Sequence, residues 1–182
     1  MTNILNHYFR YFTSSIFAFV VCNCSLESKD SGQGTENVFF SVSEFKNQLL
    51  SHEAKKVKTS ALKDKFVGIY FSASWCPPCR TFSPKLVDFR DKNKDQFEVV
   101  FVSSDGSQED QFKYIKKANM KWLTLPNGSE AGSAIAKKFA IRGIPSLVIV
   151  SPEGKVISKN GRGDVTKSPS SALEQWKQLA VK

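Results

Sequence analysis

Two cysteines lie close together in the segment Trp75-Cys76-Pro77-Pro78-Cys79. Cysteines separated by two residues can close a small disulfide ring, and a proline directly after the first can begin a helix, where its missing N–H costs nothing. Such a pair can also supply half of a metal site. The pattern therefore indicates redox chemistry or metal binding. The rest of the sequence is needed to decide between these two uses.

The surrounding sequence argues against most other uses of the pair. Covalent haem attachment needs a histidine after the second cysteine, and Arg80 occupies that position. A zinc site normally has four ligands, but no second pair with this spacing follows and the only histidines are His7 and His52. A purely structural disulfide is an alternative, although it would close so short a loop that it constrains the unfolded chain little. Redox chemistry without a metal is the favoured interpretation.

The flanking segments place Cys76 at a corner between a strand and a helix. Residues 65–72 form an apolar run that predicts a buried strand, and apolar residues recur near helical spacing over 79–90. Free N–H groups and the positive end of a helix dipole can lower a cysteine pKa from about 8.5 into the range of roughly 3.5–7.5. We therefore expect Cys76 to be the attacking thiolate. Cys79, one turn into the helix and facing inward, would resolve the mixed disulfide.

A second feature lies far along the chain, where Pro145 stands at the start of an apolar strand in the segment 141–150. A proline is tolerated at such a position because it cannot donate to a ladder. A cis bond between Ile144 and Pro145 would explain a kinked entry into the strand. The alternative is that this proline only marks a transition from loop to strand.

The segment 70–80, followed by Phe82 and Pro84, resembles the active-site segment of tryparedoxins and nucleoredoxins in the thioredoxin superfamily. Residues 99–105 and 120–126 are similar to two further segments of those proteins, and the resemblance covers about 38–182. The cysteine motif is also similar to that of bacterial periplasmic thioredoxin-like proteins. The resemblance implies an α/β thioredoxin-like fold with a mixed central β-sheet flanked by helices. It further implies dithiol–disulfide exchange through a Cys76–Cys79 redox disulfide, with no other cofactor.

The resemblance also implies a substrate groove around the two cysteines. In thioredoxin-like proteins a cis proline faces the disulfide, a role that falls here to Pro145, and neighbouring backbone groups pair with an extended substrate. Trp75 would border the reactive sulfur, although packing of its ring inside the fold is the alternative. The substrate-binding residues expected on these grounds are Trp75, Pro77, Pro78, Gly143, Ile144 and Pro145.

One position departs from ordinary thioredoxins. Those proteins carry a buried aspartate six residues before the first active cysteine, where it helps to move the proton of the second, whereas Tyr70 occupies that position here. Tryparedoxin-like proteins share the departure. The sequence does not identify the base that deprotonates Cys79.

The rest of the pattern fits one α/β domain over 38–182. We predict strands over 97–103, 147–150 and 155–158, and helices over 108–117, 130–139 and 170–181. The turn chemistry of residues 152–155 predicts a hairpin. Pro84 is expected to kink the first helix without ending it, and residues 39–50 predict an added strand or helical turn.

The beginning of the chain has a different character. Residues 12–21 form an apolar run, which is too short for a membrane-spanning helix of about 20 residues, and residues 28–35 have the composition of a linker. We expect a secretory or lipoprotein-like leader over 1–24 and a linker over 25–37. A cleaved signal peptide, an uncleaved or mitochondrial-type segment and a disordered tail are alternatives.

Two cysteines at the end of the apolar run have a role separate from the redox pair. Cys22-Asn23-Cys24 resembles a bacterial lipoprotein cleavage site, with Cys24 as the candidate for lipidation and Cys22 as the alternative. Lipidation there would tether the chain to a membrane through its N-terminus. The expected location on this interpretation is the periplasm or cell envelope, and the alternative is the cytoplasm.

The chain has a net charge of +9, which favours acidic partners through electrostatic steering. The lysine-rich segment 51–58 is expected to be a solvated surface, because no aromatic or arginine-rich interleaving marks it as a nucleic-acid site. We expect a monomeric oxidoreductase that reduces protein disulfides outside the cytoplasm and draws electrons from an upstream dithiol donor. A cytosolic tryparedoxin-like electron carrier to peroxidases and a thioredoxin-fold binding module are the alternatives.

Overall fold

The computed structural model describes residues 39–182. The predicted leader, the linker and the lipidation candidates Cys22 and Cys24 lie outside this range. Within it, no helix combines the length and the apolar character that crossing a bilayer requires.

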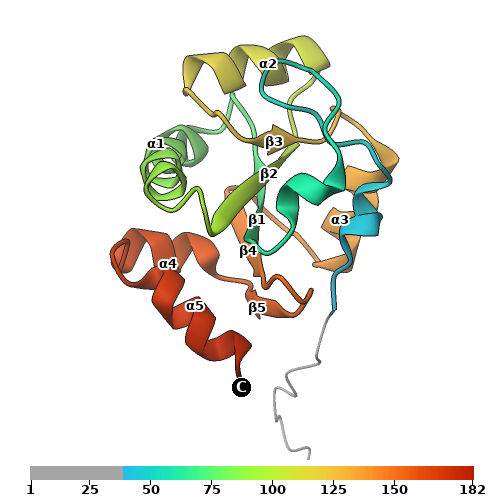
Figure 1. The fold of residues 1–182 in the computed structure, drawn as a ribbon. Coiled ribbons are helices and arrows are strands. Elements are labelled where there is room, and N and C mark those ends of the chain that lie inside the picture. Colours follow the sequence, from blue (N-terminus) through green and yellow to red (C-terminus); the bar gives the residue numbers. More distant parts are fainter. Residues whose placement is uncertain (1–38) are drawn as a thin grey trace, which may run out of the picture. The chain divides into compact units, whose positions relative to one another are not determined.

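Five strands form one mixed sheet in the order β3-β2-β1-β4-β5 (Figure 1). β1 (Phe66–Ser72) pairs in parallel with β2 (Phe97–Ser103), and β2 pairs in parallel with β3 (Leu123–Thr124). On its other side, β1 pairs antiparallel with β4 (Ser146–Val150), which forms a hairpin with β5 (Val156–Ser158). The predicted mixed α/β fold is confirmed.

Helices cover both faces of this sheet (Figure 1). One apolar core lies between the sheet and four of the five helices. A second core lies on the opposite face, under the remaining helix, α3, and the two 3-10 turns that precede β1. The helices are α1 (Pro77–Lys92), α2 (Gln108–Lys117), α3 (Glu130–Lys138), α4 (Gly161–Lys167) and α5 (Ala172–Ala180), with 3-10 turns η1 (Val42–Phe45) and η2 (Thr59–Leu62).

The central strand β1 contributes to both cores. Phe66 and Tyr70 point into the core under α1, whereas Val67, Ile69 and Phe71 point into the core under α3. This alternation follows from the two-residue period of a strand, and burial on both faces explains why the segment is a nearly continuous apolar run. The loop that follows β1 therefore leaves a strand that is buried along its whole length.

The structure contains elements that the sequence did not predict, of which α4 matters most for the site. Two of its seven residues are Gly161 and Gly163, and glycine costs about 1 kcal/mol relative to alanine inside a helix. A Cβ atom at position 161 would lie 2.7 Å from the Ile149 side chain and 3.0 Å from the Leu147 carbonyl oxygen. Glycine therefore allows α4 to lie directly against β4.

The other differences are small. The helices predicted over 130–139 and 170–181 end one or two residues away from the observed bounds of α3 and α5, as is usual for frayed ends. The first helix continues through Pro84, and the segment before β1 forms a helical turn closed by a capping box between Ser41 and Glu44. β3 has only two residues, too few for a periodic signal.

Candidate active site

Cys76 is the N-cap residue of α1, at the corner where the chain leaves β1. Its backbone is extended, and its Sγ accepts a hydrogen bond from the Cys79 N–H at 3.3 Å. Pro77 and Pro78 occupy the first two helical positions and have no N–H groups. Of the first three residues of the helix, only Cys79 therefore offers a backbone donor to the sulfur.

A disulfide joins Cys76 and Cys79, whose Cα atoms are 5.2 Å apart. Cys76 is 4% exposed and Cys79 is fully buried. Cys76 thus keeps a small exposed fraction, whereas Cys79 has none. Among residues 39–182, no three histidine, cysteine or acidic side chains gather into a group that could hold a metal ion.

The segment before β4 lies opposite the disulfide. The Ile144–Pro145 bond has the predicted cis conformation. The Ile144 carbonyl oxygen lies 3.8 Å from Cys76 Sγ. The Ile144 side chain packs against the small cluster formed by Ala73 and the two cysteines. The antiparallel pairing of β1 with β4 causes this proximity, because it sets Phe71 opposite Ser146 at the ends of the two strands.

Polar contacts hold the loop between β1 and α1. The Ser74 N–H donates to Asp105 Oδ1 at 2.7 Å, and Arg80 Nη1 donates to the Ser74 carbonyl oxygen at 2.9 Å. Asp105 is only 7% exposed, and its other carboxylate oxygen accepts from the Ser103 hydroxyl at 2.7 Å. Trp75 Nε1 donates to the Ser104 carbonyl oxygen at 3.1 Å. The end of β2 therefore positions the residues that precede Cys76.

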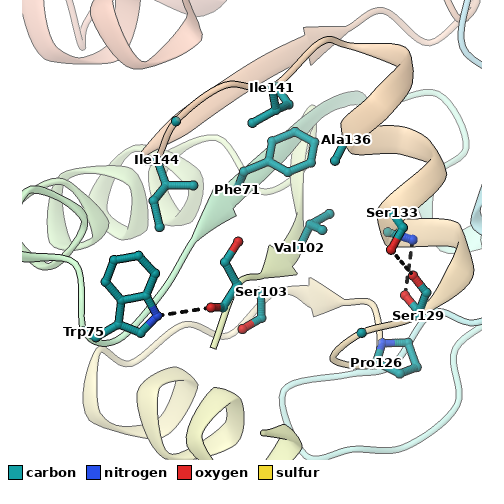
Figure 2. A pocket seen from close by; sticks show the side chains of 14 residues that line it. Phe71, Trp75, Val102, Ser103, Pro126, Ser129, Ser133, Ala136, Ile141 and Ile144 are labelled. Atoms are coloured by element: carbon teal, nitrogen blue, oxygen red, sulfur yellow. Dashed lines mark hydrogen bonds between the residues drawn. The ribbon is translucent and has the colours of Figure 1, made fainter. Parts of the chain in front are cut away.

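Trp75 is 62% exposed, which excludes the alternative of a ring packed inside the fold. Pro77, Pro78 and Gly143 are also exposed, whereas Pro145 is buried. Trp75 and Ile144 stand at one end of a cavity of about 360 Å³, and Ser129 and Pro126 at the other (Figure 2). None of the 14 residues that line the cavity is charged.

A buried hydroxyl network lies behind Cys79. The Ser83 hydroxyl donates to the Cys79 carbonyl oxygen at 3.0 Å, and the hydroxyls of Tyr70 and Tyr114 lie 2.8 and 2.7 Å from Ser83 Oγ. Because a serine hydroxyl has one proton and two lone pairs, both tyrosines donate to Ser83. Burial raises the pKa of Tyr70 far above its ordinary value, so this residue stays a neutral donor. The Tyr70 hydroxyl is thus engaged with Ser83.

Replacing Ser83 by alanine is expected to lower the free energy of unfolding by about 2 kcal/mol, because two buried tyrosine hydroxyls lose their acceptor. Urea denaturation measures the effect. Ser133→Ala is a matched control, since Ser133 makes the same hydroxyl contact to the carbonyl four residues earlier but on an exposed helix face. Equal effects of the two substitutions would contradict the role of the network.

A family model described as thioredoxin-like matches residues 64–156, which make up just over half of the chain and include the disulfide and Pro145. The chain belongs to the thioredoxin-like family. Its resemblance to tryparedoxins and nucleoredoxins extends well beyond the cysteine motif, as the following similarities establish.

The thioredoxin-like chain is 38% identical to nucleoredoxin from Danio rerio over 70% of its length, but this match covers 31% of the relative. The chain thus spans about a third of the length of the curated relatives it matches. Thioredoxin from Wuchereria bancrofti is 43% identical, with a TM-score of 0.62 over 74% of this chain and 94% of that one. Tryparedoxin II from Crithidia fasciculata is 36% identical, with a TM-score of 0.66 over 71% of this chain and 89% of the tryparedoxin.

Three residues of the thioredoxin-like site were missed by sequence reasoning. Asp105 had a weak signal, as the acidic residue after the second strand, but its contact with the cysteine loop depends on tertiary structure. Ser83 and Tyr114 had none, because they come from different helices and only the packing of these helices brings their hydroxyls together. The predicted site residues within 39–182 come from two segments, 75–79 and 143–145, which approach each other where the Ile144 carbonyl oxygen lies 3.8 Å from Cys76 Sγ.

Proposed function

We propose that this chain is a thiol–disulfide oxidoreductase in which Cys76 attacks and Cys79 resolves. The observation that carries the proposal is the placement of Cys76 Sγ at the start of α1, where it accepts the Cys79 N–H and faces the Ile144 carbonyl oxygen. A helix N-terminus stabilises a thiolate at this position. The full burial of Cys79 explains why the two sulfurs would have different roles.

The reaction starts from the dithiol form. The Cys76 thiolate attacks one sulfur of a client disulfide, the client S–S bond breaks, and one client thiolate leaves as a Cys76–client disulfide forms. Cys79 then loses its proton and attacks Cys76 Sγ, which releases the second client thiolate. Two electrons have moved from the Cys76–Cys79 dithiol to the client, and an upstream dithiol donor restores the reduced pair.

The uncharged cavity next to the disulfide supports a polypeptide client. Trp75 and Ile144 form the end nearest to Cys76, and Phe71 and Val102 lie along it (Figure 2). An apolar side chain next to the client cysteine would fill this space, while backbone groups of Gly143 and Ile144 pair with the client chain. This mode resembles the addition of an extended peptide to a sheet edge.

The similarities favour a tryparedoxin-like electron carrier, with peroxidases among its clients, over an extracytoplasmic reductant. The relatives are nucleoredoxins and tryparedoxins, and these matches give no support to a lipid-anchored envelope protein. A solved structure of tryparedoxin II, 35% identical to this chain, is a complex with glutathionylspermidine. Two molecules of a low-molecular-weight thiol supply the same two electrons as a dithiol and leave as their own disulfide, so such a thiol is a candidate for the upstream donor in our proposal.

A thioredoxin-fold binding module is the competing proposal, and trapping separates the two. Cys79→Ser is expected to accumulate a mixed disulfide between Cys76 and an oxidised client such as insulin, because the resolving thiol is missing. Non-reducing electrophoresis and mass spectrometry detect the adduct. Cys76→Ser is the control, since it leaves only the fully buried Cys79. Absence of an adduct with Cys79→Ser would favour binding without exchange.

A further inference from the structure

Two hollows near the disulfide differ in the charge of the residues that line them. The cavity beside Trp75 and Ile144 is uncharged. A second hollow of about 210 Å³ adjoins Pro78, the residue before Cys79, and lies between α1 and α4. It is lined by Pro78, Thr81, Phe82, Lys85, Arg162 and Thr166, which include two cations and no acid.

The fold fixes the positions of the two cations. Lys85 follows Pro78 by seven residues, so both lie on the same face of α1. Arg162 extends from α4, which Gly161 holds directly against β4. The hollow is thus built from two helices that are packed on the same sheet and stand side by side (Figure 1).

Both cations are available to an incoming group. Lys85 and Arg162 are exposed, and neither forms an ion pair with a carboxylate of residues 39–182. Asp164, the acid nearest to Arg162 in sequence, accepts hydrogen bonds from Ser158 and Trp176. Asp88, the acid nearest to Lys85 in sequence, is not among the carboxylates that form ion pairs within residues 39–182. Neither cation is therefore held in a direct contact with a carboxylate of residues 39–182.

We propose that Lys85 and Arg162 form a subsite for a carboxylate side chain of the client polypeptide. The inference rests on the proposed exchange reaction and specifies its substrate: a client with an apolar residue on one side of its cysteine and an acidic residue on the other. Lys85 lies roughly 13.5 Å along α1 from Cys76, at about 1.5 Å per residue. An extended client advances about 3.3 Å per residue, which puts the acid about four residues from the cysteine that bonds to Cys76.

The test uses symmetrical peptide disulfides that carry aspartate, alanine or lysine about four residues before or after the cysteine, the spacing that the helical rise gives. The reduced protein is mixed with each peptide at low salt, and the second-order rate constant is measured by chromatography of quenched samples. We expect aspartate on one side to react about three- to tenfold faster than alanine, and lysine to react more slowly, in line with two exposed ion pairs. At about 1 M salt, where the Debye length is about 3 Å, the preference should disappear.

Two double variants decide whether the subsite causes the preference. Lys85→Ala/Arg162→Ala should bring the aspartate-to-alanine rate ratio close to one. Lys92→Ala/Lys94→Ala removes the same charge from exposed lysines at and beyond the far end of α1, and should leave the ratio unchanged. Equal rates for all peptides, or equal loss of preference in both variants, would overturn the subsite and leave the exchange reaction intact. Failure to reduce any peptide would instead refute the proposed function.

Discussion

Turnover of insulin disulfides is expected to fall by at least about a thousandfold when Cys76 is replaced by serine, as happens when an enzyme loses its nucleophile. A serine hydroxyl at the start of α1 stays protonated at neutral pH, and Cys79 is fully buried and cannot take over the attack. The measurement is the rate of insulin precipitation with dithiothreitol as the donor, corrected for the rate without protein.

Cys79→Ser supplies the matched comparison for this prediction. Both variants lose the same disulfide, so any shared change in stability cancels. In a single-turnover experiment Cys79→Ser should release one client thiolate at close to the rate of the unaltered protein, whereas Cys76→Ser should release none. Comparable bursts from the two variants would show that the assignment of attacking and resolving sulfurs is wrong.

Glu98→Ala is expected to lower the free energy of unfolding by about 3 kcal/mol, because it leaves a largely buried guanidinium without its main partner. Arg90 Nε and Nη2 donate to the two oxygens of Glu98 at 2.9 and 2.6 Å, and the side chains are 15% and 9% exposed. The pair ties the C-terminal part of α1 to β2. Urea denaturation measures the loss, and a lower thermal midpoint should accompany it.

Two further variants test the cause of this loss. Glu53→Ala breaks an exposed ion pair with Lys55 of similar length, 2.7 Å, and should change the unfolding free energy by less than about 1 kcal/mol. Arg90→Met/Glu98→Leu replaces both charges with apolar side chains and should recover much of the lost stability. If the double variant were less stable than Glu98→Ala, an uncompensated buried charge would not be the explanation.

Much of the fold could be predicted from the sequence, because the relevant signals are local. The apolar run of β1, the proline after Cys76 and the helical spacing up to Phe89 all occur within one continuous segment. α4 could not be predicted in this way, since its glycines are poor helix formers and are explained only by close approach to β4. The short strand β3 exists because β2 offers it a partner.

The same distinction applies to the site. The cysteines and the cis proline have types and positions that suggest chemistry without any knowledge of their neighbours. Asp105 and Ser83 act through contacts between segments about thirty residues apart, with the backbone of Ser74 and the hydroxyl of Tyr114. The hollow beside Pro78 depends on α4, so it could not be anticipated before that helix was known.

One of the two prolines at the start of α1 also bears on the direction of electron flow. Strong disulfide oxidants owe their high reduction potential to a reduced form that is heavily stabilised. Pro77 takes nothing from the Cys76 sulfur, because an N-cap side chain accepts from the second or third residue of the helix. Pro78, at the second position, withholds one such N–H, and the sulfur accepts from Cys79. Weaker support for the reduced form favours the oxidised couple. We therefore expect Pro78 to favour the direction of the proposed reaction, in which the chain gives electrons to its clients.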